Sequence, residues 1–165
     1  MALSIVEVDP QGAEALTLLR EAAVEARALY PELHAPEAAW PTNCPTPPAG
    51  LYLLAFDGRT PVGSAALRPR EAGVVEVRRL YVSVAARRAG IATRLLLVLE
   101  QAAGHLGYAK MRLETGYRQL PAIGLYLKCG FDRIEPFDEY ANDPTSVCFE
   151  KEVAPRWRHR ADPTA

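Results

Sequence analysis

The stretch R-R-A-G-I-A-T-R, from Arg87 to Arg94, decides which fold this chain is expected to adopt. It follows a strand-like run, Val74–Val82, and leads into an apolar pattern with helical spacing that begins at Ile91. Amides at a helix start have no partner inside the helix, and the helix dipole favours negative charge there. Gly90 lets the backbone approach an anion closely, and the two leading arginines add positive charge. The stretch therefore predicts a phosphate-binding loop. Its R-x-x-G-x-A spacing differs from G-x-G-x-x-G and G-x-x-x-x-G-K, neither of which occurs in the chain.

Length and composition narrow the class of protein. With 165 residues, 49% of them hydrophobic and 24% charged, the chain is expected to form one globular domain. Its 19 basic and 20 acidic residues leave no basic footprint, which argues against nucleic acid as a partner. The longest apolar run, Leu95–Leu99, is too short to span a bilayer, and the N-terminus has no secretory pattern, so no membrane partner is expected. Cys44, Cys129 and Cys148 form no C-x-x-C pair and predict reduced thiols in a cytoplasmic protein.

Periodicity and turn residues predict alternating strands and helices around a single sheet, an α/β or α+β fold. The expected strands cover 3–8, 51–56, 61–68, 74–82, 110–114, 131–134 and 146–151, and the expected helices cover 11–29, 91–106 and 120–129. Between Pro31 and Pro48 lie six prolines, which predict a long irregular segment with a short helical turn near 37–40. Its aromatic residues favour a binding flap over a plain surface connection. We expect one domain over 1–153, followed by a frayed tail over 154–165.

Three motifs in order resemble one family. The strand E-V-R-R-L-Y-V at 76–82, the R-x-x-G-x-A loop at 87–92 and the segment L-Y-L-K-C-G-F at 125–131 look like those of the GNAT superfamily of acetyl-CoA-dependent N-acetyltransferases. The resemblance covers roughly residues 3–152. It implies a mixed, mostly antiparallel sheet with helices on both faces. A parallel pair, 74–82 and 110–114, would splay apart to hold acetyl-CoA.

The resemblance also implies where acetyl-CoA binds. Its pantetheine arm would pair with the open edge of the first splayed strand, and its pyrophosphate would rest on the amides of the loop. Amide donors and a helix dipole neutralise two phosphates without a metal, and the chain has no metal-binding motif, so no metal is expected. The residues expected to contact the cosubstrate are Leu80, Tyr81, Val82, Arg87, Arg88, Ala89, Gly90, Ile91, Ala92, Thr93 and Tyr126.

Acetyl transfer to a primary amine of a small molecule or peptide requires the amine to lose a proton before it attacks the thioester directly. Glu76 is the first candidate base, because similar proteins often carry a glutamate in this strand. Glu114, at the end of the neighbouring strand, is the second, and water remains a third. A simpler interpretation makes Glu76 a solvated or Arg78-paired residue and Glu114 a strand-end cap. A backbone N–H near Tyr81 or Val82 is the expected oxyanion donor.

Tyr126 resembles the family's general acid, which protonates the departing thiolate; the alternative is a core tyrosine whose hydroxyl reaches the surface. The leading hypothesis is thus an N-acetyltransferase. Its rival is a non-catalytic module of the same fold that binds acyl-CoA for sensing. The sequence leaves the acceptor amine unidentified, and a homodimer stays open because related folds are often dimers.

Overall fold

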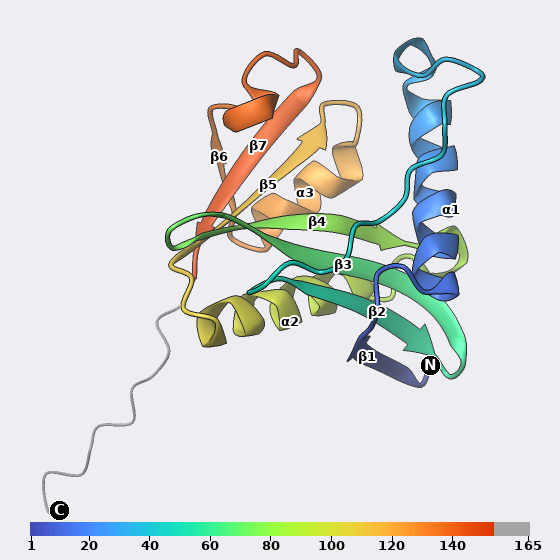
Figure 1. The fold of residues 1–165 in the computed structure, drawn as a ribbon, viewed down its shortest axis with the longest axis horizontal. Helices are drawn as coiled ribbons and strands as arrows, with labels where there is room; N and C mark the ends of the chain where they lie inside the picture. Colours follow the sequence, from blue (N-terminus) through green and yellow to red (C-terminus); the bar gives the residue numbers. More distant parts are fainter. Residues whose placement is uncertain (154–165) are drawn as a thin grey trace, which may run out of the picture.

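Seven strands form one mixed sheet in the computed structural model, which describes residues 1–153 (Figure 1). The strand order is β1-β2-β3-β4-β5-β7-β6, and only the β4–β5 pair is parallel. The strands are β1 (Leu3–Glu7), β2 (Leu51–Asp57), β3 (Thr60–Glu71), β4 (Val74–Val82), β5 (Lys110–Gly116), β6 (Asp132–Ile134) and β7 (Ser146–Glu152). The α-helices are α1 (Ala13–Leu29), α2 (Ile91–His105) and α3 (Leu120–Lys128). The tail predicted for 154–165 lies outside the described residues.

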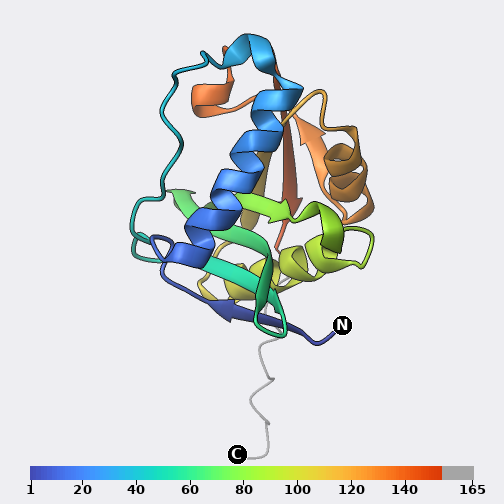
Figure 2. The same ribbon diagram turned by 90° about the vertical axis from the view of Figure 1, so that its right-hand side faces the viewer.

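Helices cover both faces of the sheet, as expected. Because successive strand side chains point to opposite faces, Leu53 and Ala55 of β2 pack with α2 and α3, whereas Tyr52 and Leu54 pack with α1. Figure 2 shows α1 crossing in front of the sheet. Each fully buried leucine contributes about 1.5–3 kcal/mol of hydrophobic stabilisation, so the central strands, buried on both faces, form a rigid platform.

The parallel pair diverges after three positions. β4 and β5 are paired at Val74–Lys110, Val75–Met111 and Glu76–Arg112, although both strands continue beyond these residues. In Figure 1 the two strands start together and open into a V. On its other side β4 stays paired with β3, but a β-bulge interrupts the ladder where Arg79 adopts a φ of 58°. The backbone edge of β4 that faces β5 is therefore open from residue 77 onward.

Helix boundaries follow the glycines and prolines. α2 begins after Gly90, which has a φ of 77°, and α3 ends before Gly130, which has a φ of 89°. The helical turn predicted near 37–40 was wrong, because the 3-10 turn lies at Pro31–Leu33, where proline occupies the first helical position. Residues 38 and 39 instead direct their carbonyls to the guanidinium of Arg27, both at 2.9 Å.

The segment between Leu33 and Gly50 runs back alongside α1 (Figures 1 and 2). The guanidinium carbons of Arg20 and Arg27 each lie 3.5 Å from the centroid of the Trp40 ring, which attaches the segment to the helix. Further on, the buried Asn43 donates from Nδ2 to the carbonyl of Pro10 at 2.8 Å. The segment is thus attached to the rest of the domain at Trp40 and Asn43, and its role as a binding flap stays a prediction.

Candidate active site

The loop before α2 presents a row of open amides. Arg94 donates the first backbone bond of the helix, from its N to the carbonyl of Gly90 at 3.1 Å. Within residues 1–153, the amides of residues 88–93 have no acceptor. Positive φ values at Arg88 and Gly90, with a negative one between them, turn successive N–H groups toward a common concave side. This arrangement, at the N-terminus of a fifteen-residue helix, can bind an anion.

Arg87 contributes less to this loop than the sequence predicted. Its amide closes a 3-10 turn by donating to the carbonyl of Val84 at 3.3 Å, so it does not belong to the open row. Its guanidinium turns toward α1, where Nη2 donates to Glu25 Oε2 at 2.6 Å and Nε donates to the carbonyl of Val82 at 2.9 Å. The side chain expected to meet phosphate thus ties the loop to α1. Arg88 has an exposed side chain, and Ile91 is buried in the core.

The three residues at the end of β4 that were expected to contact acetyl-CoA lie on two different faces of the sheet. Leu80 and Val82 pack against the core beneath α2, on the same side as the phosphate loop. Tyr81 lies on the α1 side, where its hydroxyl donates to Glu21 Oε2 at 3.4 Å. All three belong to the strand whose edge toward β5 is open, so their backbone groups can meet an extended ligand there.

Glu114 lies where β5 diverges from β4. Its Oε1 accepts a hydrogen bond from the Ser146 hydroxyl at 2.9 Å, and the side chain is only partly exposed. Burial raises the pKa of Glu114 above its ordinary value, with the Ser146 hydrogen bond opposing this shift. The second carboxylate oxygen has no partner within the described residues. This carboxyl can therefore accept a proton without breaking an ion pair.

Tyr126 approaches the same opening from the other face. Its ring packs between Phe131 and Phe149, with centroids 6.0 and 5.7 Å away. Burial raises the pKa of Tyr126 well above its ordinary value, and the charge of Glu114 raises it further. The Tyr126 hydroxyl has no hydrogen-bond partner among residues 1–153. Within these residues, Nε of Arg70 is the only side-chain nitrogen or oxygen that both lacks a partner and is closed off from solvent, so the Tyr126 hydroxyl must be open to solvent. Its raised pKa means that it keeps its proton at neutral pH.

Glu76 is completely buried, at 0% exposure, and is surrounded by arginines. Arg68 Nη2 lies 2.7 Å from its Oε1, and Arg70 Nη2 lies 2.8 Å from its Oε2. Arg78 Nη1 is 3.6 Å from Oε1, so the arginine pairing weighed as an alternative is present and involves more arginines than expected. Both oxygens are occupied, and accepting a proton would require one ion pair to break. The roles of Glu76 and Glu114 as bases stay predictions.

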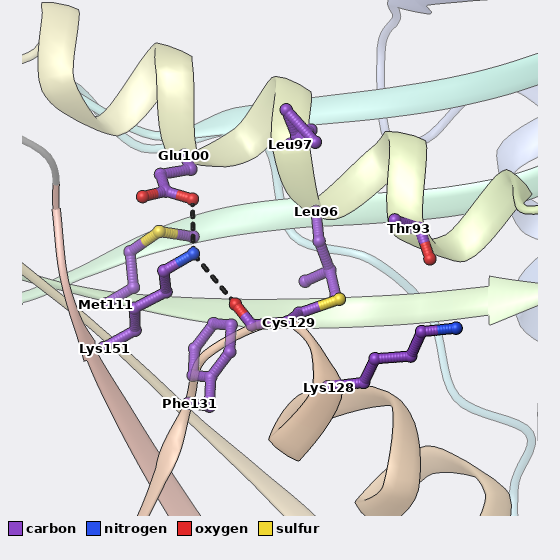
Figure 3. A pocket seen from close by; sticks show the side chains of 9 residues that line it. All are labelled: Thr93, Leu96, Leu97, Glu100, Met111, Lys128, Cys129, Phe131 and Lys151. Carbon is purple, nitrogen blue, oxygen red and sulfur yellow. Dashed lines mark hydrogen bonds and ion pairs between the residues drawn. The ribbon is translucent and has the colours of Figure 1, made fainter.

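A pocket of about 380 Å³ opens between α2 and α3 (Figure 3). Thr93, in the first turn of α2, and Lys128, at the end of α3, line the same end of it. At the other end, Lys151 Nζ donates to Glu100 Oε2 at 2.8 Å and to the carbonyl of Cys129 at 2.9 Å. The pocket therefore continues from the phosphate loop along the groove between the two helices.

Sequence reasoning missed the partners of the predicted bases. Arg68 and Arg70 come from β3, and Ser146 begins β7, so only the sheet pairing brings them to Glu76 and Glu114. The alternating R-x-R of Arg68 and Arg70 in a hairpin strand was a usable signal, because it places both on one face. Cys44, Cys129 and Cys148 form no disulfide within the described residues, and their reduced state in the cell stays a prediction. Among the described residues no His, Cys, Asp or Glu side chains gather as metal ligands, and no helix is long and apolar enough to cross a membrane.

Comparison with known proteins agrees with this geometry. The family model described as Acetyltransferase (GNAT) family matches residues 15–131. An IAA acetyltransferase of Azospirillum brasilense is 40% identical over 101 residues, which are 61% of this chain and 66% of that protein. A Klebsiella pneumoniae protein assigned as an acyl-CoA N-acyltransferase superposes with a TM-score of 0.76 at 29% identity, covering 92% of this chain and 98% of that one.

Ligand-bound relatives share the fold. The PaiA N-acetyltransferase of Thermoplasma acidophilum, solved in complex with coenzyme A, has a TM-score of 0.68 at 20% identity and covers 92% of this chain and 99% of its own. The family match extends over most of the described chain and includes β4, the loop of residues 87–90, α2 and α3. The chain belongs to the GNAT family of acetyltransferases and is by class an acyltransferase.

Proposed function

We propose that this protein transfers the acetyl group of acetyl-CoA to a primary amine by direct attack, using Glu114 as base and Tyr126 as acid. The observation that carries the proposal is the opening between β4 and β5, with the open amides of 88–93 at one side and Glu114 and Tyr126 at its mouth. An extended thioester ligand needs an anion site, a strand edge and a proton donor, and all three meet here.

The pyrophosphate of acetyl-CoA fits the amide row of the phosphate loop. The pantetheine arm would add to the open edge of β4 near Leu80, Tyr81 and Val82, as a peptide adds to a sheet edge. The pocket between α2 and α3 continues from this loop, and Lys128 offers an ammonium group beside Thr93 for a further phosphate. CoA-bound relatives of the same fold support this assignment.

The chemistry needs two proton transfers on opposite faces of the sheet. The amine attacks the thioester carbonyl, a C–N bond forms and the C–S bond breaks; the amine proton passes to Glu114, and the CoA thiolate takes a proton from Tyr126. Glu114 belongs to the α1 face, whereas Tyr126 packs in the core under α2 and α3. Burial raises the pKa of Glu114, which makes its carboxylate a better proton acceptor near neutral pH.

Glu114 is preferred to Glu76 as base on geometric grounds. Glu76 has both oxygens engaged by Arg68 and Arg70, whereas Glu114 has one free oxygen and a single hydroxyl donor. In this proposal Glu76 positions arginines and takes no proton. A water molecule can still relay the proton between the amine and Glu114.

The test is release of CoA thiol from acetyl-CoA with a panel of primary amines, measured beside calorimetric binding of acetyl-CoA. Amine-dependent thiol release, with the acetylated amine identified by mass spectrometry, is the expected result. Tight binding of acetyl-CoA without release for any amine would refute the transferase and support the non-catalytic alternative.

A further inference from the structure

Two arginines on the α1 face of the sheet converge on one buried oxygen. Arg68 and Arg78 both direct a nitrogen at Oε1 of Glu76, at 2.7 and 3.6 Å. Their guanidinium groups are therefore neighbours, one from β3 and one from β4, held together by a carboxylate that solvent does not reach. Two neighbouring positive charges repel each other, and the buried carboxylate of Glu76 offsets this repulsion.

Both guanidinium groups keep donors on their outer side. Arg68 uses only Nη2, which donates to Glu76 Oε1 at 2.7 Å and to Glu139 Oε1 at 3.2 Å. Arg78 uses only Nη1, which donates to the Tyr140 hydroxyl at 2.7 Å. Their side chains are 40% and 31% exposed. The remaining nitrogens of Arg68 and Arg78 have no hydrogen-bond partner among residues 1–153. Within the described residues only Nε of Arg70 is both without a partner and closed off from solvent, so these nitrogens are open to solvent. They form a two-sided fork suited to a carboxylate.

Both carboxylates and further guanidinium groups surround this fork. Glu139 Oε1 lies 3.2 Å from Arg68 Nη2, and Asp138 Oδ2 lies 3.6 Å from Arg70 Nη1. Arg70 is occupied, because it donates to both oxygens of Glu139 at 2.8 and 2.6 Å as well as to Glu76. Arg79 adds a fourth guanidinium whose partners are the neutral Asn43 and the carbonyl of Thr42. Burial lowers the pKa of Arg79, and the charges of Arg78 and Arg68 lower it further, which reflects the crowding of positive charge on this face.

We infer that the acceptor is an amino-carboxylic acid, whose carboxylate binds between Arg68 and Arg78 while its amine points toward Glu114. This inference deepens the proposed function and rests on it. Glu76 pairs with Arg112 at the last paired position of β4 and β5, and Arg78 and Glu114 each lie two residues further along their strands. An acceptor held on the fork is therefore at the level of Glu114 in the sheet.

Matched acceptor pairs test the inference on the wild-type protein. Each pair consists of an amino acid and its carboxamide, which have the same side chain and the same attacking amine. We expect the amino acid to show a KM at least about tenfold lower than the amide, since a charge-assisted pair is lost in the amide. Because the amide amine is less basic and so more often neutral, kcat is compared at a pH where both amines are fully deprotonated. Equal or better use of the amides across the pairs would overturn the inference while leaving the transferase intact.

A variant pair adds a second readout. Arg78→Gln should raise the KM for the amino acid about tenfold and leave the KM for the amide unchanged, so that the preference within a pair disappears. Arg59→Gln, on the exposed β2–β3 turn, removes the same charge away from the site and should preserve the preference. An unchanged preference in Arg78→Gln would also overturn the inference. Release of no CoA with any acid or amide would instead refute the proposed function itself.

Discussion

Replacing Glu76 by glutamine separates a positioning role from a catalytic one. The amide has nearly the shape of the carboxylate but removes the negative charge that three arginines share. If Glu76 organises the arginines, the variant should lose stability first. If Glu76 is the base, as the sequence alone favoured, it should lose turnover while remaining stable.

The structure sets the size of the stability loss. Removing one partner of a buried ion pair costs about 3–5 kcal/mol, because the other charge is left uncompensated. Arg70 is only 14% exposed but keeps Glu139, and Arg68 is 40% exposed and stays partly hydrated. The loss should thus lie at the lower end, about 3 kcal/mol. For a chain of 165 residues this corresponds to a fall in Tm of roughly 6–12 °C.

Thermal melting of Glu76→Gln beside Glu139→Gln tests this reasoning. Glu139 pairs with the same Arg70 but is 50% exposed, so its loss should cost no more than about 1 kcal/mol. Below the melting range, Glu76→Gln should keep a kcat within about threefold of wild type and show a raised KM for the acceptor. A Tm within about 2 °C of wild type, with a rate lowered about 10²-fold that recovers at high pH, would refute the positioning role and make Glu76 the base.

The remaining predictions concern the base, the acid and the phosphate loop. Ser146→Ala removes the hydrogen bond that lowers the pKa of Glu114, so the acidic limb of the pH profile of kcat/KM should move to higher pH. A limb at the wild-type pH would exclude Glu114 as the titrating group. Tyr126→Phe should lower kcat about 10²-fold with unchanged acetyl-CoA affinity by calorimetry, whereas wild-type turnover would make the tyrosine structural. Gly90→Asp should weaken acetyl-CoA binding at least about tenfold. Gly58→Asp is its control, because Gly58 also has a positive φ and free space for a side chain but lies on a distant turn; equal binding by the two variants would remove the phosphate-loop assignment.

The fold was largely predictable because the residues that begin and end its helices and strands act on their immediate neighbours in the sequence. Gly90 precedes the start of α2 and Gly130 follows the end of α3, both with positive φ, and the valine-rich run at the start of β4 marks a buried strand whatever its neighbours are. The pairing of Glu76 with Arg78 was weighed from the sequence, but its ion pair with Arg68 was not, because strand register and not sequence distance brings Arg68 opposite Glu76. Arg87 shows the same limit. Its positive charge predicted a contact with phosphate, but its guanidinium donates instead to Glu25, 62 residues earlier in the sequence. Interactions between neighbours in the sequence could thus be predicted, whereas the competition of distant residues for the same side chain could not.

The splayed pair β4–β5 has a consequence for the order of events. Because the open amide row and Tyr126 lie on one side of the sheet and Glu114 with the arginines on the other, two substrates can enter from opposite sides without exchanging places. Neither has to leave before the other binds, so we expect both to occupy the protein together when the acetyl group moves. Initial rates measured at several fixed acceptor concentrations should therefore give converging double-reciprocal lines. Parallel lines would indicate an acetylated protein as a separate intermediate, which this geometry does not require.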